Sequence, residues 1–408
     1  MGRIQTPVGH SSTIRKEVRT LRDDGRGKIL FAVSAGSFLI VGVQMIYPVM
    51  LPELRVAYGL NLGTAGLLLT LLWAANAIGQ IPSGILADEI GEKRTLLLSV
   101  VLSAVTIVLI VSFESSAALF ASTVLLGAGL ALFGVARYTI MYETYPDRAG
   151  TTIGIVLAAA DAGQSLLPPL ASVLTVVVAW QLGFGFTIPI FILIAVTIWL
   201  YIPREVSSEK QSSEHMSLSR FAETLSMMYT KRVIFATTIF VIYVCVWVSF
   251  TSFYPTYLIE SKNIPQTTTA ILFGSFFAAG VVIKPLSGAI YDRVGIRRTL
   301  MVLAPISALA LIAFPLAEGV LPIAVITLLV APLLGSGTIA QSYLIEIFTH
   351  DVRGTGLGII RTCGLLIGST TPAIFGFFAE IGYFDEGFLA LALLIGTMIT
   401  LIMLLPSK

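Results

Sequence analysis

Long hydrophobic runs recur along almost the whole chain and are separated by short polar segments. Each run has roughly the length that an α-helix needs to cross a bilayer, which is about 20 residues. Twelve runs can be counted, at residues 29–51, 62–86, 96–113, 117–141, 151–177, 182–202, 233–258, 268–291, 299–316, 320–345, 355–379 and 387–405. The pattern predicts an all-α membrane protein with twelve transmembrane helices.

One long polar segment, residues 203–232, divides the runs into two sets of six. We therefore expect a six-helix bundle at 29–202 and a second bundle at 233–405, with tails at 1–28 and 406–408. The segment between the bundles is rich in Ser, Glu and Lys and is expected to be a cytoplasmic linker. Its second half repeats apolar residues at steps of three and four, which predicts a short amphipathic helix on the membrane surface. These residues are Leu218, Phe221, Leu225 and Met228.

Composition agrees with a membrane protein, because 56% hydrophobic and 12% charged residues lie far outside the range of soluble chains. The positions of the charges then predict the orientation. Twenty of the 25 Lys and Arg residues lie on the side that carries both termini, and the opposite side has two, Arg55 and Lys262. By the positive-inside rule, both termini are expected in the cytoplasm, with the protein in the plasma membrane.

Two short phrases occur twice, each time 204 residues apart. SGILADEIGEKRT begins at Ser83 and returns as SGAIYDRVGIRRT at Ser287, while GTTIG begins at Gly150 and returns as GTGLG at Gly354. The first phrase follows the second helix of each set, and the other opens the fifth. Two motifs at one spacing indicate a duplicated unit, and hence two pseudo-symmetric bundles.

The first phrase resembles the signature between helices 2 and 3 of the major facilitator superfamily (MFS) of secondary transporters. The signature reads Gly-x-x-x-Asp-(x)-x-Gly-x-(Arg/Lys)-(Arg/Lys), and both copies match it. The matching residues are Gly84, Asp88, Gly91, Lys93 and Arg94, and then Gly288, Asp292, Gly295, Arg297 and Arg298. A second family-like phrase places an acid before an Arg-Gly-Thr type of turn, here Glu143 with Arg148 and Glu346 with Arg353.

The resemblance implies the MFS fold, with two bundles around a central cavity, and transport by alternating access. It also implies that Asp88 and Asp292 hold a cytoplasmic gate shut when the cavity faces outward. Alternatively, these residues only fix the topology and the shape of the loops.

Four charged residues lie within the predicted helices: Arg137, Asp161, Lys284 and Arg361. A charge at the bilayer centre costs about 2.5–3.5 kcal/mol on insertion scales, so such residues are usually paired or face water. From the helical rise of about 1.5 Å per residue, Lys284 and Arg361 lie at matched depth, each roughly 12 Å from the cytoplasmic end. The resemblance places their two helices side by side around the cavity.

Two interpretations of this pair stay open. Lys284 and Arg361 can bind an anionic substrate such as a carboxylate, with Arg giving two parallel hydrogen bonds and Lys a point charge. Alternatively, Arg361 pairs with Glu346, and Lys284 reaches backbone carbonyls or the membrane interface.

Asp161 lies near the middle of the bilayer, roughly 20 Å deep, and the expected partner is Arg137 on the preceding helix. As a structural pair, the two residues would fix one helix against the other. As a functional pair, Asp161 would carry the coupling proton, and substrate or conformation would change its protonation.

Further candidates for substrate contacts lie on helices that line the cavity in this family. Tyr243, Trp247 and Tyr254 share one face of the seventh helix. An aromatic face of this kind is as typical of packing as of a binding surface. The candidates are Gln44, Tyr47, Asn76, Gln341, Tyr243, Trp247 and Tyr254, together with Arg137.

The favoured function is a secondary active transporter of a small organic anion, coupled to protons as a symporter. Proton-driven efflux of amphipathic or drug-like compounds is an alternative, although the fifth helix lacks the Gly-Pro-x-x-Gly-Gly signature of such antiporters. A transporter-like membrane sensor is an alternative from another class.

An enzyme is not expected, because the sequence has no catalytic or phosphate-binding constellation and its three His residues lie in tails or loops. Neither a cofactor, a metal nor a nucleic acid is expected. The expected partners are the substrate, a proton or other coupling ion, and the lipid bilayer, around a monomer.

Overall fold

The computed structural model describes residues 26–203, 230–348 and 353–405, and within these ranges it contains helices but no strands. The amphipathic helix predicted at residues 218–228 lies outside the described residues. So do residues 1–25 and 406–408 of the two tails.

Among the described residues, the first bundle contains seven α-helices and one short 3-10 helix. They are α2 (Arg26–Tyr58), α3 (Leu62–Ile90), α4 (Glu92–Ser112), α5 (Ser116–Thr144), η2 (Pro146–Arg148), α6 (Ala149–Val177), α7 (Trp180–Gly185) and α8 (Thr187–Tyr201). The second bundle follows in the same way. Its helices are α10 (Lys231–Glu260), α11 (Gln266–Ala313), α12 (Val320–Val330), α13 (Pro332–Ile347), α14 (Arg353–Ser369), α15 (Thr371–Glu380) and α16 (Phe384–Leu404).

The prediction of twelve spans is confirmed, although eleven membrane-capable helical segments are found among the described residues. The difference lies in α11, whose helical conformation is interrupted at Gly295, with φ 80° and ψ 170°. α11 therefore carries two predicted spans, 268–291 and 299–316. The pairs α7 and α8, α12 and α13, and α14 and α15 each form one further span.

The duplicated phrase has the same local structure in both copies. Gly91, with φ 85°, ends α3, and Gly295 has nearly the same φ 204 residues later. A positive φ is readily accessible only to glycine, which explains why the signature has this residue at the turn. In each copy the threonine four residues on returns a hydrogen bond to the glycine carbonyl, at 3.0 Å from Thr95 and 2.9 Å from Thr299.

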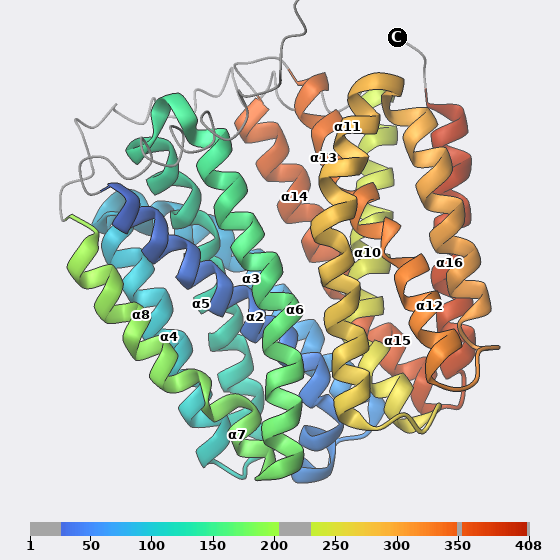
Figure 1. The fold of residues 1–408 in the computed structure, drawn as a ribbon, viewed down its shortest axis with the longest axis horizontal. Helices are drawn as coiled ribbons and strands as arrows, with labels where there is room; N and C mark the ends of the chain where they lie inside the picture. The colour runs from blue at the N-terminus through green and yellow to red at the C-terminus, as the bar shows by residue number, and fades with distance from the viewer. Residues whose placement is uncertain (1–25, 204–229, 349–352, 406–408) are drawn as a thin grey trace, which may run out of the picture.

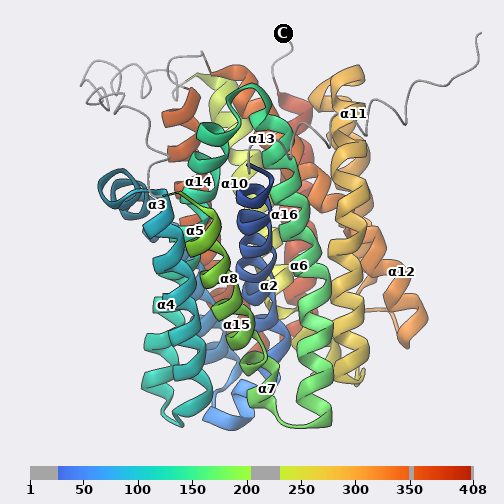
Figure 2. The same cartoon turned by 60° about the vertical axis from the view of Figure 1, so that its left-hand side comes forward.

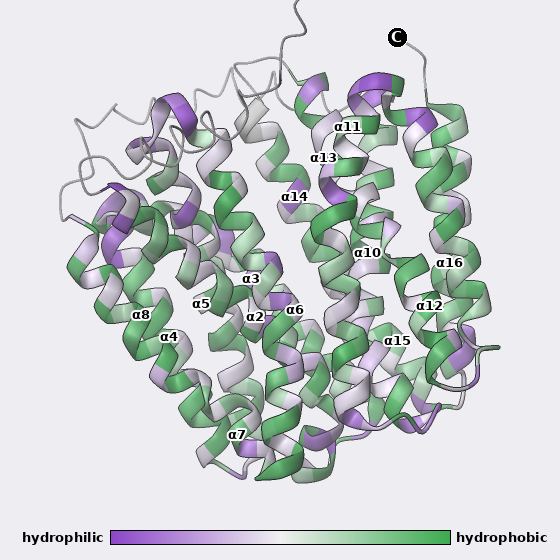
Figure 3. Ribbon diagram, in the orientation of Figure 1, coloured by the Kyte–Doolittle hydropathy of each residue, from purple (hydrophilic) through white to green (hydrophobic). Residues whose placement is uncertain are grey.

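The two bundles stand side by side, with α2 beginning and α16 ending at the same end of the molecule (Figure 1). We call this end, which also carries Gly91 and Gly295, the motif end. The views in Figures 1 and 2 agree that α6 of the first bundle lies beside α11 of the second. α3 packs on α14 and α15 across the same interface. Hydrophilic residues gather at both ends of the helices, while the surfaces between are mainly hydrophobic, as lipid requires (Figure 3).

The end opposite the motif end is closed by direct contacts between the bundles. A Cβ atom on Gly66 of α3 would clash with the backbone carbonyl of Pro372, so glycine is what allows these helices to touch. Nearby, Ala373 N donates to Thr70 Oγ1 at 2.9 Å, and Gly63 N donates to Glu380 Oε2 at 3.0 Å. An ion pair between Arg55 and Glu260 joins the bundles at the same end.

Candidate functional site

A cavity of about 870 Å³ lies between the two bundles. α2, α3 and α5 form one wall, and α10 and α14 form the other. Cavities of several hundred Å³ between helices of a bundle are the usual sites for small ligands. Its polar and aromatic lining residues are Gln44, Trp73, Asn76, Gln80, Phe133, Arg137, Tyr138, Thr139, Trp247, Arg361, Thr362 and Cys363.

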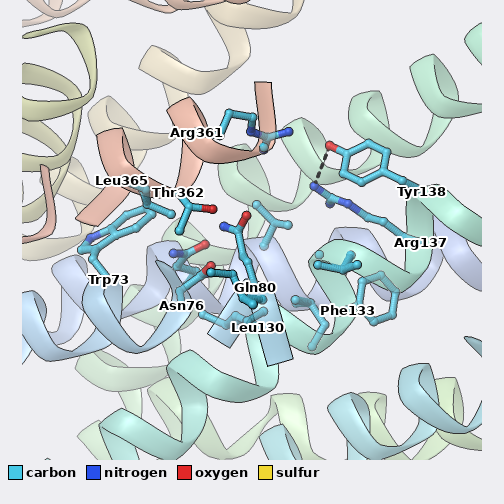
Figure 4. Close-up of a pocket in the computed structure, with 18 of the residues that line it drawn as sticks. Trp73, Asn76, Gln80, Leu130, Phe133, Arg137, Tyr138, Arg361, Thr362 and Leu365 are labelled. Atoms are coloured by element: carbon cyan, nitrogen blue, oxygen red, sulfur yellow. Dashed lines mark hydrogen bonds between the residues drawn. The ribbon is translucent and has the colours of Figure 1, made fainter. Parts of the chain in front are cut away.

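Two arginines from opposite bundles meet in this cavity. Arg137 projects from α5 and Arg361 from α14, and both extend toward Tyr138 (Figure 4). Arg137 Nη2 donates a hydrogen bond of 3.2 Å to the Tyr138 hydroxyl. The phenol oxygen therefore accepts from one of the two cations and lies toward the other (Figure 4).

Neither arginine has a carboxylate partner within the described part of the chain. The Nε and Nη1 atoms of Arg137 are buried there without any hydrogen-bond partner. A buried cation without a counter-charge is unfavourable in a medium of low dielectric constant. The arrangement is thus suited to an anion that enters from solution.

The other end of the cavity is aromatic. Trp73 of α3 and Trp247 of α10 meet edge to face across the bundle interface, with ring centroids 5.1 Å apart. The indole Nε1 of Trp247 is buried without a partner among the described residues, as is the amide Nε2 of Gln44. Gln44 is 7% exposed.

Helical rise gives the depth of each layer below the motif end. Arg137 lies seven residues from the end of α5 and Arg361 eight from the start of α14, or about 10–12 Å. Trp73 lies seventeen residues from the end of α3 and Trp247 sixteen from the start of α10, or about 24–26 Å. The arginines thus lie nearer the motif end, and the tryptophans form the floor.

Asp161 does not pair with Arg137, so that part of the sequence prediction is wrong. Lys284 Nζ instead donates to both carboxylate oxygens of Asp161, at 2.7 and 2.9 Å. Gln164 Nε2 adds a longer contact of 3.4 Å to Oδ1. The pair joins α6 to α11 and has only partial exposure, with 14% of the Asp161 side chain and 29% of the Lys284 side chain accessible.

This pair also changes the interpretation of Lys284. Lys284 was expected to bind an anionic substrate or to reach backbone carbonyls or the membrane interface, whereas its partner is a carboxylate of the N-terminal bundle. Lys284 is not among the residues that line the cavity, while Arg361 is. A direct contact between Lys284 and substrate stays a prediction.

The alternative partner of Arg361 is not found either. Glu346 accepts a hydrogen bond of 2.5 Å from the Tyr291 hydroxyl, and no ion pair joins it to Arg361 in the described ranges.

The remaining candidates divide into two groups. Gln44, Asn76 and Trp247 line the cavity with the two arginines. Tyr47 and Tyr254 are instead fully buried and bond to Thr123 and Thr327, respectively, so they hold helices together within one bundle. Gln341 and Tyr243 are half-buried and are not lining residues of this cavity.

The signature residues are found at the motif end. Asp88, Arg94, Asp292 and Arg298 are exposed, and within the described residues neither aspartate forms an ion pair with the other bundle. Glu143 and Arg148 are exposed at the same end, whereas the side chain of Arg353 lies outside the described residues. The role of this motif in a gate stays a prediction.

Two cavity residues were missed in the sequence. Tyr138 directly follows Arg137 and was not considered, although a phenol beside an intramembrane arginine is a natural acceptor. Trp73 lies in an apolar run in which an aromatic residue gives no distinct signal. No group of three His, Cys, Asp or Glu side chains that could hold a metal ion is found in the described ranges.

The sequence model described as "Major Facilitator Superfamily" matches residues 33–369. The chain is 24% identical over 318 residues to the "Nitrite extrusion protein" of Bacillus subtilis (strain 168), which covers 77% of this chain and 78% of that protein. It is also 24% identical over 363 residues to the "Probable 4-methylmuconolactone transporter" of Cupriavidus pinatubonensis, and this match covers 84% of this chain and 81% of that protein.

Among solved structures, a bacterial homologue of the human lysosomal transporter Spinster, in an inward-facing and unoccupied conformation, superposes with a TM-score of 0.74. It shares 16% sequence identity, and the match covers 94% of this chain and 97% of that one. At this identity the likeness supports the fold. Together with the family match over most of the chain, it identifies this multi-pass membrane protein as a member of the Major Facilitator Superfamily, a family of transporters rather than enzymes.

Proposed function

We propose that this protein is a secondary active transporter of a small organic anion, which binds between Arg137 and Arg361. The observation that carries the proposal is that two guanidinium groups, one from each bundle, line a single cavity without a carboxylate partner in the described residues.

An anion at this position has a clear physical advantage. Guanidinium groups present parallel N–H donors that match the two oxygens of a carboxylate, and such charge-assisted bonds are about twice as strong as neutral ones. The anion would also replace the missing counter-charge of two partly desolvated cations.

The position between the bundles suits alternating access. A ligand held by one arginine from each bundle favours the conformation in which the two are closest, so binding energy would drive closure around the substrate. The repeated signature at the motif end, with Asp88 and Asp292, would then close the cavity on that side.

The names of the relatives support an anionic substrate. Nitrite, which the name of the Bacillus subtilis protein mentions, is an anion. Several staphylococcal relatives at 21–22% identity carry the name "Probable nitrate transporter NarT".

We further propose that the Asp161–Lys284 pair is the coupling site for protons. An intramembrane carboxylate that bridges the two bundles can exchange its partner for a proton, and the loss of the ion pair would loosen α6 from α11. In this proposal the transporter is a proton symporter. It is a monomer in the plasma membrane, and both termini face the cytoplasm, as the distribution of Lys and Arg favours.

Thermal stabilisation of the purified protein by nitrate, formate, acetate and benzoate tests the anion proposal, because a specific ligand raises stability by mass action. At least one anion should raise Tm at millimolar concentration. Arg137→Gln and Arg361→Gln should each weaken its binding about 10- to 100-fold, since one charged hydrogen bond contributes about 1.5–3 kcal/mol.

Arg55→Gln is the matched control, because Arg55 is also an interbundle cation but lies at the opposite end and is paired with Glu260. It should leave the affinity unchanged. Anion binding that survives in both Arg137→Gln and Arg361→Gln would refute the proposed site.

A further inference from the structure

The residues that line both ends of the cavity carry buried hydrogen-bond donors without a partner among the described residues. At the arginine layer these are Nε and Nη1 of Arg137, and at the aromatic floor they are Nε2 of Gln44 and Nε1 of Trp247. All four atoms are donors, and each is buried without a partner among the described residues. Because a buried donor without an acceptor is destabilising, the ligand that fits should supply acceptors at both ends.

The two sets of donors are well separated along the cavity. By helical rise, Trp73 and Trp247 lie about 12–16 Å farther from the motif end than Arg137 and Arg361. A nitrate or acetate ion is only a few atoms across, so it can contact one end but not both.

The wall between the two ends is largely apolar. Ile40, Leu130, Phe133 and Leu365 line it, and Trp73 is itself 4% exposed. Asn76 and Gln80 interrupt this surface from α3, between the two layers (Figure 4). A flat hydrophobic body would bury its faces against such a wall, whereas a small hydrated ion would leave it unfilled.

We infer that the substrate is a carboxylate on a flat apolar ring that carries a second hydrogen-bond acceptor on the side away from the carboxylate. The carboxylate lies between Arg137 and Arg361, the ring lies against the apolar wall, and the second acceptor receives hydrogen bonds from Trp247 Nε1 and Gln44 Nε2. This inference rests on the proposed function, and it narrows the substrate from anions in general to ring-bearing oxo-carboxylates.

The test compares the affinities of five probes for the purified full-length protein: 4-acetylbenzoate, benzoate, acetate, nitrate and the neutral ketone acetophenone. 4-Acetylbenzoate should bind about ten-fold more tightly than benzoate, because its acetyl oxygen accepts from the floor donors. Benzoate should in turn bind at least ten-fold more tightly than acetate or nitrate. Acetophenone, which lacks the carboxylate, should bind weakest of the ring compounds.

Trp247→Phe keeps a ring in place but removes the indole donor. It should reduce the preference for 4-acetylbenzoate over benzoate by about five-fold and leave the affinity for benzoate within about two-fold. Trp199→Phe is the matched control, because Trp199 lies on α8, is 59% exposed and is not a lining residue. The measured quantity for each variant is the ratio of its affinities for 4-acetylbenzoate and benzoate. A smaller fraction of folded protein leaves this ratio unchanged.

The outcomes separate this inference from the function on which it rests. Nitrate or acetate binding as tightly as benzoate, in a manner that depends on Arg137 and Arg361, would overturn the ring-bearing class and leave the anion site in place. If Trp247→Phe and wild type prefer 4-acetylbenzoate over benzoate equally, the proposed hydrogen bond from Trp247 to the second acceptor is wrong. Acetophenone binding as tightly as benzoate would overturn both proposals.

Discussion

Two pairs of charged side chains lie at the interface between the bundles, and they differ in how their charge is compensated. Asp161 and Lys284 neutralise each other within the protein, with both carboxylate oxygens bonded at 2.7 and 2.9 Å. Arg137 donates to the Tyr138 hydroxyl, and neither Arg137 nor Arg361 has a carboxylate partner among the described residues. Both pairs belong to membrane-spanning helices, where isolated charge is unfavourable.

The difference indicates separate roles. A pair that is complete in the protein alone stabilises one arrangement of α6 and α11 and changes only when a proton or a movement separates it. Two like charges that lack a counter-charge gain most from an external anion. We therefore assign substrate recognition to the arginines and coupling to the Asp161–Lys284 pair.

The largest effect on anion affinity is expected when the arginine pair is given a carboxylate of its own, as Lys284 already has in Asp161. Tyr138→Glu places a carboxylate where the phenol now lies, toward which both guanidinium groups extend (Figure 4). It should weaken anion binding about 100-fold, because the site would already hold its own anion, while stability is kept or increased. Isothermal titration with the best-bound anion and a parallel Tm measurement check this.

Tyr138→Gln is the neutral control and should weaken binding by no more than about ten-fold, since it removes one hydroxyl without adding charge. If Tyr138→Glu binds the anion as tightly as Tyr138→Gln does, the two arginines are not its ligands.

A double-mutant cycle on Asp161 and Lys284 should give the next largest effect, which is on stability. Lys284→Gln leaves the Asp161 carboxylate without its cation. We expect the free energy of unfolding to fall by about 2 kcal/mol. This is less than the roughly 3–5 kcal/mol lost when a fully buried pair is broken, because both side chains are partly exposed. The double variant Asp161→Asn with Lys284→Gln should recover most of it. Thermal unfolding in one detergent measures all four proteins, and additive losses would mean that the pair does not act as a unit.

Transport by Asp161→Asn separates coupling from recognition. This variant should exchange labelled substrate across proteoliposomes at a rate within about three-fold of wild type, because the arginine site is intact. Accumulation driven by a pH gradient should fall about ten-fold or more, since the permanently neutral side chain can no longer alternate between proton and lysine. Full accumulation by Asp161→Asn would remove this residue from the coupling role.

The smallest effect is expected from a third interbundle pair, Arg55 with Glu260, at the closed end. Their side chains are 18% and 33% exposed, and partly solvated ion pairs contribute about 0.2–1 kcal/mol. Glu260→Gln should therefore lower stability by less than about 1 kcal/mol and leave anion affinity unchanged. If Glu260→Gln lowers Tm as much as Lys284→Gln does, solvent exposure does not explain how much each ion pair contributes to stability.

The sequence was sufficient for the fold because each signal is local. Hydrophobic runs give the spans, and the repeat at Ser83 and Ser287 gives the duplication. The structure adds the reason for two signature glycines, since Gly91 and Gly295 are the residue type that a positive φ requires. In α11 the two predicted spans, 268–291 and 299–316, are separated by the interruption of the helix at Gly295.

The site was harder to predict because depth along a helix does not fix direction around it. Lys284 and Arg361 were placed at one depth, but Lys284 faces α6 and Arg361 faces the cavity. The partners Asp161 and Lys284 are 123 residues apart and belong to different bundles, so their pairing depends on how the bundles pack. Trp73 was missed because a buried tryptophan on an apolar helix resembles ordinary packing in the sequence.

The central claim is that an organic anion is held between Arg137 and Arg361, and a structure with 4-bromobenzoate tests it most directly. Anomalous scattering from bromine locates one end of the ligand independently of the protein density. We predict that the carboxylate lies between the two guanidinium groups, with the bromine near Trp73 and Trp247. A bromine peak elsewhere, or a carboxylate bound to Lys284 in place of Asp161, would contradict the claim.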